Sequence, residues 1–504
     1  MRDSMFPKKI IIAGGGTAGW MSASLLQHSW PESDIVLIES ENIGTIGVGE
    51  GSTPGLRNFF KTLNISEQEW MPFCNATFKS GIEFPNWSVT PGYESYFHPF
   101  FSSLDSDTGK LFFKLAKEQK SGFPNNAHPD HFFISKQIAY QNKAPKSLNT
   151  QNFRLDYGYH FDAGLLAIFL KKRCLNLGLK HISDDITDVK MNEFGEIKEL
   201  ITNKNNAQSA DLYIDCTGFR ALIIQQTLKS EFISFSDNLF NDRAVAIQTP
   251  KTMQSSIRAS TKSTALSNGW AWEIPLTNRY GNGYVYSSSF ISPDQAEQEL
   301  RTHLNIGDKD DVKVRHLAMK IGRIDKHWNK NCLAVGLSQG FIEPLEATAL
   351  MLVQFTLETF IEQYTVNQQE QIKRQFQYNS RINMTFEGIR DYIVTHYKTN
   401  SRSDSEYWLK CRENNNISNN LSALLDAWKN PNPNVFEDEL NKQGDSSPYL
   451  RASWFVILAG MGQFPHQALV KNNAIKHHQR AQKHCTEFVE KSFLDHRQYL
   501  DEMK

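Results

Sequence analysis

The chain has 504 residues, which is more than one compact core usually holds, so we expect two or three domains or one large domain with an insertion. Its 54 basic and 55 acidic residues nearly cancel, which argues against nucleic acid and anionic membrane as partners. The six cysteines form no CxxC pair, and no apolar run reaches the roughly 18 residues of a membrane helix. We therefore expect a cytoplasmic protein without a metal site, a disulfide framework or a signal peptide.

The first 40 residues predict a βαβ unit with a dinucleotide site. Residues 9–13 and 34–39 are apolar strands, and apolar side chains repeat at helical spacing between them. The turn after the first strand matches GxGxxG, where glycine permits a tight turn and a close approach of a pyrophosphate. Glu39 ends the second strand, where an acid can bind a ribose hydroxyl. The predicted cofactor residues are Gly14, Gly16, Thr17, Ala18, Gly19 and Glu39.

The middle of the chain is less regular. Residues 91–150 are rich in Pro, Gly, Ser, Asn and aromatic residues, which predicts a loop-rich insertion at the substrate site. Residues 197–202 and 211–214 flank a turn-rich tetrapeptide and predict a hairpin. Asp215 ends the apolar run 211–215 before a small-residue turn. That pattern resembles the second cofactor-contacting strand of FAD-dependent monooxygenases, so it favours FAD over NAD.

Beyond residue 340 the spacing predicts long amphipathic helices. Pro344 suits the first turn of a helix, which would place Glu346 near the helix N-terminus, where the dipole alone favours an acid. The predicted fold is α/β, with a Rossmann-like, monooxygenase-type FAD-binding core and a mainly helical C-terminal substrate module. We assign residues 1–90 and 151–349 to the core, 91–150 to the insertion and 350–504 to the helical module.

Three further segments carry a family resemblance. Residues 270–275 read WxWxIP, residues 77–82 hold a lysine between apolar residues, and residues 340–348 read Gly-Phe-Ile-Glu-Pro-Leu-Glu-Ala-Thr before a helix. Together with the glycine turn they resemble the flavin-dependent tryptophan halogenase family, from the first strand to about residue 355. Residues 48–54 and 159–162 match as well.

The resemblance implies a halogenase that uses FADH2, O2 and chloride or bromide to halogenate an electron-rich, indole-like aromatic through hypohalous acid. It also implies a separate flavin reductase that supplies FADH2, and it is compatible with a homodimer. The alternative is an FAD-dependent aromatic monooxygenase, which would reduce its own flavin with NADPH. A flavin-binding protein without turnover is a third reading.

Two residues would carry the chemistry by resemblance. Lys79 alone would read as a surface lysine, but in the family it receives or orients hypohalous acid. A neutral amine could attack electrophilic halogen and an ammonium could donate a hydrogen bond to it, and the sequence leaves both open. Glu346 would stabilise positive charge on the ring and help remove the displaced proton.

The resemblance also assigns the surroundings of these two residues. Thr348 and the backbone around Ala349 would hold the halide, although Ala347 and Ala349 stand where Ser and Gly are common, so a serine relay is unavailable. Trp270, Trp272, Ile274 and Pro275 would shape a tunnel, or simply form a buried aromatic strand. Further cofactor contacts are expected at Gly49, Asp215 and Gly336.

The substrate end departs from the pattern of free-tryptophan halogenases. His98 and Phe100 fall where the family holds an aromatic substrate, as do Trp454 and Phe455 in reversed order. Of the groups that hold an amino-acid head group, only Tyr449 remains in the segment that begins at Ser447. A site without paired polar groups would bind a zwitterion poorly. Indole or another electron-rich aromatic is therefore the expected substrate.

Overall fold

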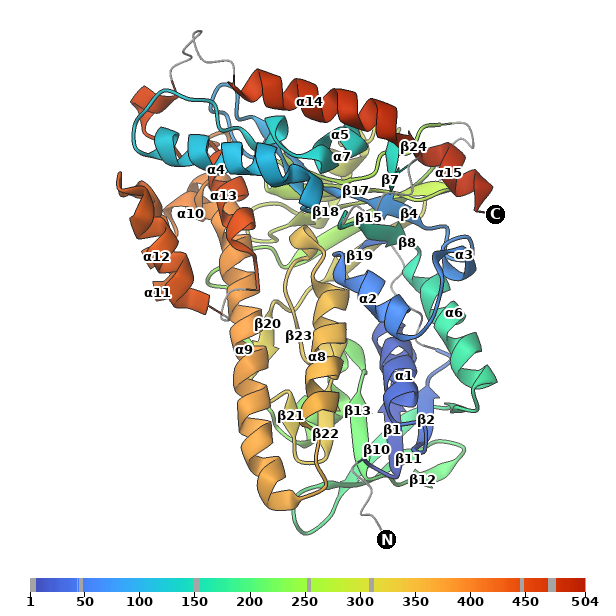
Figure 1. The fold of residues 1–504 in the computed structure, drawn as a ribbon. Coiled ribbons are helices and arrows are strands. Elements are labelled where there is room, and N and C mark those ends of the chain that lie inside the picture. The colour runs from blue at the N-terminus through green and yellow to red at the C-terminus, as the bar shows by residue number, and fades with distance from the viewer. Residues whose placement is uncertain are drawn as a thin grey trace.

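The computed structural model describes residues 6–42, 44, 49–147, 155–251, 255–307, 312–444, 448–469 and 477–503. Val48 and Ser447, which belong to two of the matched segments, lie outside the described residues. Figure 1 shows an α/β molecule in which a parallel sheet and its helices fill the lower half, while α14 (His477–Ser492) runs across the top. The predicted fold class is confirmed, because a sheet core is followed by a mainly helical C-terminal part.

The parallel sheet has six strands in the order β21-β22-β13-β1-β2-β9. Its strands are β1 (Lys9–Ala13), β2 (Asp34–Glu39), β9 (Lys180–Ser183), β13 (Leu212–Asp215), β22 (Cys332–Ala334) and the antiparallel edge strand β21 (Trp328–Asn329). Ile12 of β1 pairs with Leu37 and Ile214, and the strand is buried on both faces. That burial explains its continuous run of isoleucines. Helix α1 (Thr17–Ser29) packs on one face together with α6 (Ala163–Asn176) and α8 (Ala349–Gln363).

A second sheet holds seven strands in the order β19-β15-β18-β17-β16-β5-β6. They are β19 (Val314–Ala318), β15 (Arg243–Pro250), β18 (Arg279–Tyr286), β17 (Gly269–Pro275), β16 (Thr261–Leu266), β5 (Gly81–Pro85) and β6 (Ser95–Pro99). All neighbours are antiparallel except β16 and β5. Because side chains alternate along a strand, Trp270, Trp272 and Ile274 of β17 share one face. Helix α7 (Pro293–His303) packs against β15 and β18.

Short elements connect the two sheets. β3 (Glu50–Gly51), β8 (Gly158–Phe161) and β4 (Thr77–Lys79) form one small sheet, and β14 (Phe232–Ser234), β20 (Gly322–Ile324) and β23 (Gly340–Phe341) form another. Helices α2 (Gly55–Thr62) and α3 (Glu67–Trp70) follow β3. β4 thus brings Lys79 to the junction between the parallel sheet and the seven-stranded sheet.

Two sequence expectations fail in this region. The predicted hairpin is right in its first strand and its turn but wrong in its second strand: β11 (Ile197–Thr202) pairs across the turn with β12 (Asn206–Gln208), and also with β10 (Ile186–Met191), while β13 joins β1 in the parallel sheet. Continuous burial of β13 is typical of a central parallel strand. Residues 91–150 also hold more regular structure than their composition predicts, with β6, α4 (Ser106–Lys120), α5 (Ile134–Tyr140) and β7 (Lys143–Ser147).

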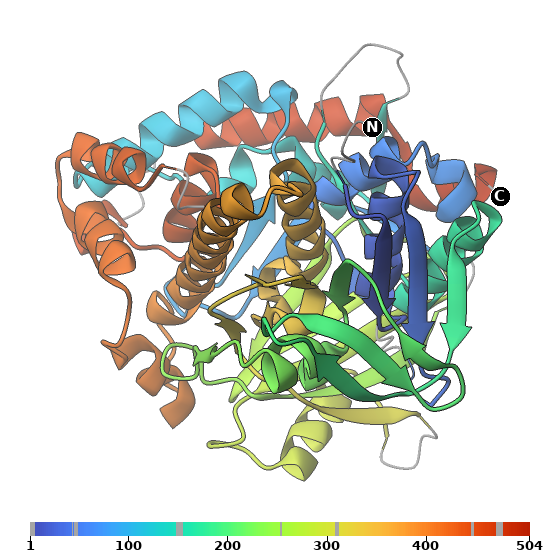
Figure 2. The ribbon, with the colours of Figure 1, turned by 90° about the horizontal axis from the view of Figure 1, so that it is seen from below.

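The C-terminal helices begin at α8. They continue with α9 (Gln368–Lys398), α10 (Glu406–Glu413), α11 (Asn419–Lys429), α12 (Pro433–Gln443), α13 (Arg451–Gly460), α14 and α15 (His496–Glu502); β24 (Phe493–Asp495) pairs with β7. Figure 2 shows α8 and α9 side by side at the centre of the view from below. Within the described residues, no helix is both long and apolar enough to cross a membrane.

The start of α8 differs from the expectation. Pro344 opens a short 3-10 turn, Pro344–Glu346, and Ala347 then adopts a left-handed backbone with φ of 56°. α8 begins only at Ala349. Glu346 therefore precedes the helix and does not belong to its first turn, so the dipole explanation for this acid loses its basis.

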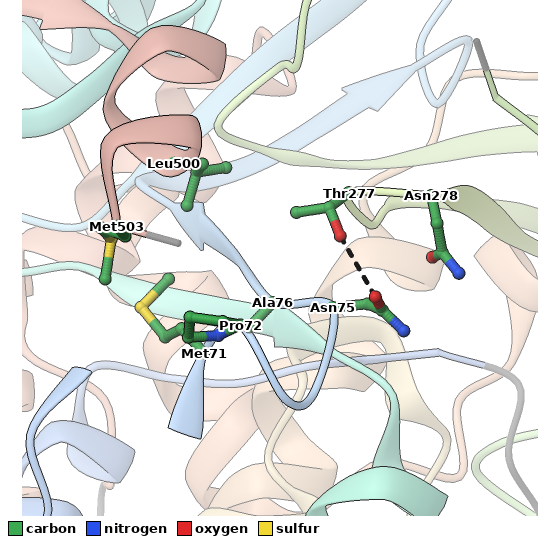
Figure 3. A pocket seen from close by; sticks show the side chains of 8 residues that line it. All are labelled: Met71, Pro72, Asn75, Ala76, Thr277, Asn278, Leu500 and Met503. Carbon is green, nitrogen blue, oxygen red and sulfur yellow. Dashed lines mark hydrogen bonds between the residues drawn. The ribbon is translucent and has the colours of Figure 1, made fainter. Parts of the chain in front are cut away.

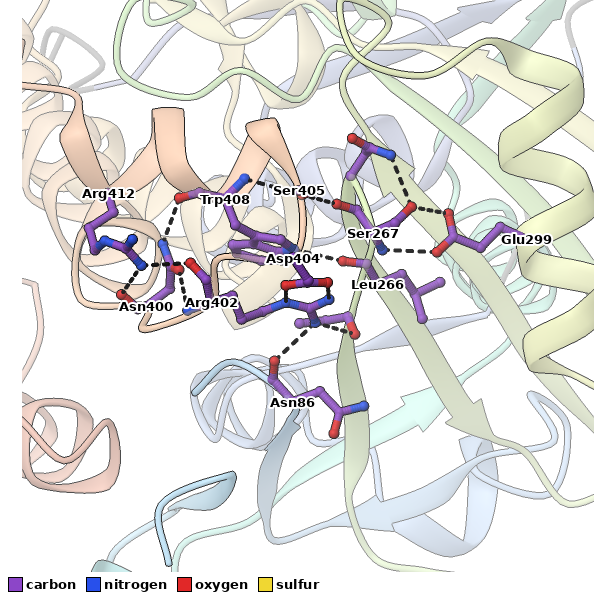
Figure 4. A network of polar contacts seen from close by, with 12 residues as sticks. Asn86, Leu266, Ser267, Glu299, Asn400, Arg402, Asp404, Ser405, Trp408 and Arg412 are labelled. Carbon is purple, nitrogen blue, oxygen red and sulfur yellow. Dashed lines mark hydrogen bonds and ion pairs between the residues drawn. The ribbon is translucent and has the colours of Figure 1, made fainter. Parts of the chain in front are cut away.

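The helical part meets the sheets at two further places. Arg402, between α9 and α10, donates to the backbone carbonyls of Asn86 and Ala265 at 3.0 Å each and pairs with Asp404 at 2.6 Å (Figure 4). At the other end, α15 closes a small, largely apolar hollow of about 100 Å³ (Figure 3). Its lining residues are Met71, Pro72, Asn75, Ala76, Thr277, Asn278, Leu500 and Met503.

Candidate active site

A cleft of about 500 Å³ lies between the glycine turn, β17 and the start of α8. It collects most of the residues that the sequence marks for cofactor, halide and tunnel. Those that line it are Gly14, Gly16, Thr17, Ala18, Glu39, Gly49, Lys79, Trp270, Trp272, Ile274, Gly336, Thr348 and Ala349. The structure therefore brings segments from residue 14 to residue 349 to one cleft.

The glycine turn forms a cradle with two different kinds of glycine. Gly14 has φ of 112°, and a Cβ on it would lie 2.3 Å from the Cys216 carbonyl oxygen; a Cβ on Gly19 would lie 1.9 Å from the Gly14 oxygen. These two glycines are needed for the turn to pack at all. A Cβ on Gly16 would meet nothing within 4 Å, because Gly16 borders the cleft. Among the described residues no side-chain cap bond is made at the N-cap Gly16 of α1, so the first N–H groups suit a pyrophosphate.

The two acids predicted for the cofactor behave differently. Glu39 lines the cleft and pairs with Lys171 and with His181 Nε2, the latter at 2.8 Å. Asp215 is fully buried and does not line the cleft. Its carboxylate accepts hydrogen bonds from the backbone N–H groups of Thr217, Ile223 and Ile224. The structure thus assigns Asp215 to supporting the turn that follows β13, and Thr217 and Gly218 of that turn line the cleft in its place.

Lys79 reaches the cleft from β4 although its side chain is fully buried. Among the described residues its Nζ has no hydrogen-bond partner. Burial lowers the pKa of this amine from 10.5 to about 7, against the opposing effect of the Glu346 charge. The ring of Phe100 lies 5.5 Å from Nζ. An amine with this pKa exists in both charge states near neutral pH.

Glu346 lies behind Lys79 and does not line the cleft. Burial raises the pKa of its carboxyl, but His98, His396 and Lys79 lower it by more, so the pKa is below its ordinary value. His396 Nε2 lies 3.1 Å from Glu346 Oε1. Burial in turn lowers the pKa of His98, and neither of its ring nitrogens has a hydrogen-bond partner among the described residues. A charged carboxylate is therefore held in a buried region.

Aromatic rings enclose that region. The rings of Tyr392 and Tyr449 stack at 3.6 Å between centroids, and Trp454 meets Tyr392 edge-on at 5.0 Å. Phe455 does not join them. Its ring packs on Phe113, Trp428 and Phe436 at 5.3 to 5.5 Å. Adjacent residues on a helix point about 100° apart, so Trp454 and Phe455 cannot both face the same site, and Phe455 belongs to the core between α4, α11 and α12.

The WxWxIP strand also has residues that line the cleft and one that does not. Trp270, Trp272 and Ile274 line the cleft, whereas Pro275 does not; its carbonyl accepts a hydrogen bond of 2.7 Å from Thr77 Oγ1. Trp270 Nε1 donates to Glu343 Oε2 at 3.0 Å. Glu343 Oε2 also accepts from Asn241 Nδ2 and from the Tyr397 hydroxyl. A buried network therefore fixes the ring of Trp270.

Glu343 and His396 are site residues that the sequence reasoning did not single out. Glu343 stands in the segment 340–348, and only its neighbour Glu346 was assigned a role there. His396 is a polar residue in the buried stretch of α9 from Asp391 to Tyr397. A histidine in such a stretch usually reads as core, so the local pattern alone gave no reason to choose it.

The start of α8 offers an anion site. Thr348 is buried and lines the cleft, and Ala349, the first helical residue, is exposed toward it. In the part of the chain that the structure describes, Thr348 makes no side-chain cap bond to this helix, so its first N–H groups suit an anion. A helix N-terminus favours a bound anion, which suits a halide. Among the described residues, no group of three or more His, Cys, Asp or Glu could hold a metal ion.

Comparison with known proteins gives one consistent result. The family model described as tryptophan halogenase matches residues 9–476. A tryptophan 6-halogenase of Streptomyces toxytricini is 35% identical over 481 residues, covering 90% of each chain. The solved tryptophan halogenase of Shewanella frigidimarina superimposes with a TM-score of 0.85 at 33% identity, covering 98% of this chain and 97% of that one. A flavin-dependent halogenase from Xanthomonas campestris gives 0.83 at 29% identity, with 99% and 98% covered.

Proposed function

Since this chain belongs to the tryptophan halogenase family and is a flavin-dependent halogenase, we propose that its substrate is an indole-like aromatic that reacts between Lys79 and Glu346. One observation carries this assignment. Lys79 lines the glycine-bordered cleft. Its charge also acts on Glu346 in the buried aromatic region next to the cleft. These relatives do not favour the monooxygenase alternative.

The cleft fits FAD because its glycines leave a cradle that a Cβ would fill. Gly16, Thr17 and Ala18 would hold the pyrophosphate at the start of α1, Glu39 a ribose hydroxyl, and Gly49 and Gly336 would border the remainder. Thr348 and the N–H of Ala349 would hold chloride or bromide. Reduced FAD with O2 supplies the oxidising power that turns halide into hypohalous acid.

Lys79 then receives or orients the electrophilic halogen. Its pKa of about 7 leaves both charge states populated near neutral pH. The neutral amine can form an N–halogen bond with loss of hydroxide, and the ammonium can polarise hypohalous acid by donating a hydrogen bond. Glu346 stabilises the positive charge that develops on the ring and accepts the proton from the substituted carbon.

The aromatic wall points to a ring without a zwitterionic head group. Tyr392, Tyr449 and Trp454 offer flat surfaces. Arg451 of α13 pairs with Glu437 and lies over the rings of Phe113 and Phe455, outside this wall. A free amino acid would need groups that pair with both its ammonium and its carboxylate. Indole therefore suits this wall better than tryptophan does.

We propose a separate flavin reductase as the partner that supplies FADH2. A cytoplasmic location agrees with six free cysteines among the described residues, and the homodimer stays a prediction. The test supplies the purified protein with a reductase, FAD, NADH, O2 and bromide, and screens indole, tryptophan and phenols by mass spectrometry. Brominated indole in excess of brominated tryptophan is expected. NADPH oxidation by the protein alone, with hydroxylated product, would overturn the proposal.

A further inference from the structure

His396 of α9 lies between the backbone carbonyl of Tyr392 and the carboxylate of Glu346. Its side chain is fully buried, its Nδ1 lies 3.2 Å from the backbone oxygen of Tyr392 one turn earlier, and its Nε2 lies 3.1 Å from Glu346 Oε1. The rings of Phe84 and Trp87 pack on it at 4.8 and 5.7 Å between centroids. The side chain of His396 is therefore enclosed by protein.

These two contacts fix where protons must be. A carbonyl oxygen can only accept, so Nδ1 has to carry a hydrogen. A neutral imidazole has one such hydrogen, and with it on Nδ1 the Nε2 lone pair would face the carboxylate oxygen at 3.1 Å. That repulsion becomes an attraction when Nε2 also carries a proton, because the ring is then a cation 3.1 Å from the carboxylate oxygen. The contact is an ion pair, since Nε2 and Oε1 do not have the geometry of a directed hydrogen bond.

The other ionisable groups near Glu346 differ from His396 in their charge or in their contacts. Glu343 is also close enough to act on His396, but three donors already converge on its Oε2. Burial lowers the pKa of His98 and raises the pKa of the Tyr96 hydroxyl, so burial disfavours the charged form of each. Lys79 acts on Glu346 from the cleft side.

We propose that His396 is the positioning residue for Glu346: by holding one proton against Oε1 it keeps the carboxylate ionised and leaves Oε2 to face the ring. The inference rests on the proposed role of Glu346 and deepens it. In the step it serves, the ring carbon–hydrogen bond breaks, its electron pair returns to the ring, and the proton binds Oε2. The proton on Nε2 stays in place, so after the step His396 Nε2 and Glu346 Oε2 each carry one proton.

The first test is His396→Gln, whose amide can still donate to Glu346 but cannot carry positive charge. The matched control is His327→Gln, another fully buried histidine that contacts α9 through Asn383. With His396 replaced, the pKa of Glu346 should rise, so the acidic limb of the halogenation profile should move to higher pH. We expect a loss of kcat of roughly a hundredfold, as for general acid–base groups, and a loss at pH 6 about tenfold larger than at pH 8. FADH2 oxidation and KM should stay at the values of the control.

A loss of equal size at every pH would show a purely structural role and overturn the inference. If wild type halogenates nothing in the panel, the proposed function fails, and a second measurement still decides the inference. In wild type labelled with 15N-histidine, the His396 resonance, identified by its absence in His396→Gln, should report hydrogen on both ring nitrogens. In Glu346→Gln it should report hydrogen on Nδ1 alone. A wild-type tautomer with hydrogen on Nε2 only, or a signal unchanged in Glu346→Gln, would contradict the inference.

Discussion

The cofactor cleft and the aromatic region behind it are built in opposite ways. The cleft uses backbone: glycines and uncapped helix N-termini border an open volume of about 500 Å³. The region around Glu346 uses side chains that are buried and contributed by β4, β6, the turn before α8, α9 and α13. The backbone of the cleft tolerates a glycine substitution wherever a Cβ has room. A buried charge, in contrast, is destabilised by the loss of any one of its partners.

This contrast makes the two regions separable by experiment. A substitution in the aromatic region should stop halogenation and spare flavin oxidation. A substitution in the glycine turn should reduce both in proportion to bound FAD. The changes below run from the largest expected effect to the smallest.

Lys79→Ala should give the largest separation. Product formation should fall by about a thousandfold or more, in the range seen when a reacting group is removed. FADH2 oxidation should continue, because no group that holds FAD is lost. Halogenated product by mass spectrometry and flavin absorbance in the same reaction measure both. Lys110→Ala, in which an exposed lysine is lost, is the control, and product near the control level would refute the role of Lys79.

Glu346→Gln keeps the shape of the side chain and removes its charge. Loss of one group that stabilises developing charge typically costs about a hundred- to thousandfold in kcat, and we expect that range. The assay should use indole at saturating bromide, so that weaker halide binding does not contribute. FAD affinity should be unchanged. A comparable loss of FAD affinity would instead assign Glu346 to the architecture of the turn.

Gly16→Ala and Gly19→Ala sharpen the contrast within the cleft. A methyl group on Gly19 would meet the Gly14 oxygen at 1.9 Å, so the apoprotein should lose roughly 1–3 kcal/mol of stability, as overpacked sites do. A methyl group on Gly16 meets no atom of the described residues within 4 Å, so the apoprotein Tm should not change while FAD binds more weakly. Thermal melts and flavin titrations test both, and equal Tm values for the two variants would contradict the assignment.

The last change concerns the dependence of stability on pH and leaves activity aside. Burial holds the pKa of Lys79 near 7 in the folded chain, against an ordinary 10.5, so the unfolded chain binds more protons between these values. The cost of burying the charge is fully present below pH 7 and fades as the pH rises toward 10.5. Lys79→Met should therefore be more stable than wild type at pH 6, with a smaller difference at pH 9. Denaturant melts at both pH values measure this, and a difference independent of pH would exclude a shifted pKa.

The contrast between the cleft, built from backbone, and the region around Glu346, built from side chains, also explains which features the sequence could predict. The β1–α1 turn is contiguous, so its glycines and Glu39 could be placed from local spacing alone. The sequence predicts Phe455 at the substrate and Asp215 at the cofactor, and both stay predictions. The ring of Phe455 packs on Trp428 and the Asp215 carboxylate accepts from the Ile223 N–H, and local sequence does not show which way a buried side chain turns. Pro344 was read as a helix start because the left-handed residue Ala347 carries no signal. His396 meets Glu346 only through the packing of α9, which no local pattern reports.

The most direct test of the account is one reaction of wild type with indole, a flavin reductase, FAD and bromide under 18O2, followed by mass spectrometry of the product. In the proposed mechanism oxygen serves only to oxidise the halide, and the resulting hypohalous acid reaches Lys79. Bromoindole without 18O is therefore expected, and no product when bromide is omitted. A hydroxylated indole that carries one 18O and no bromine would contradict it.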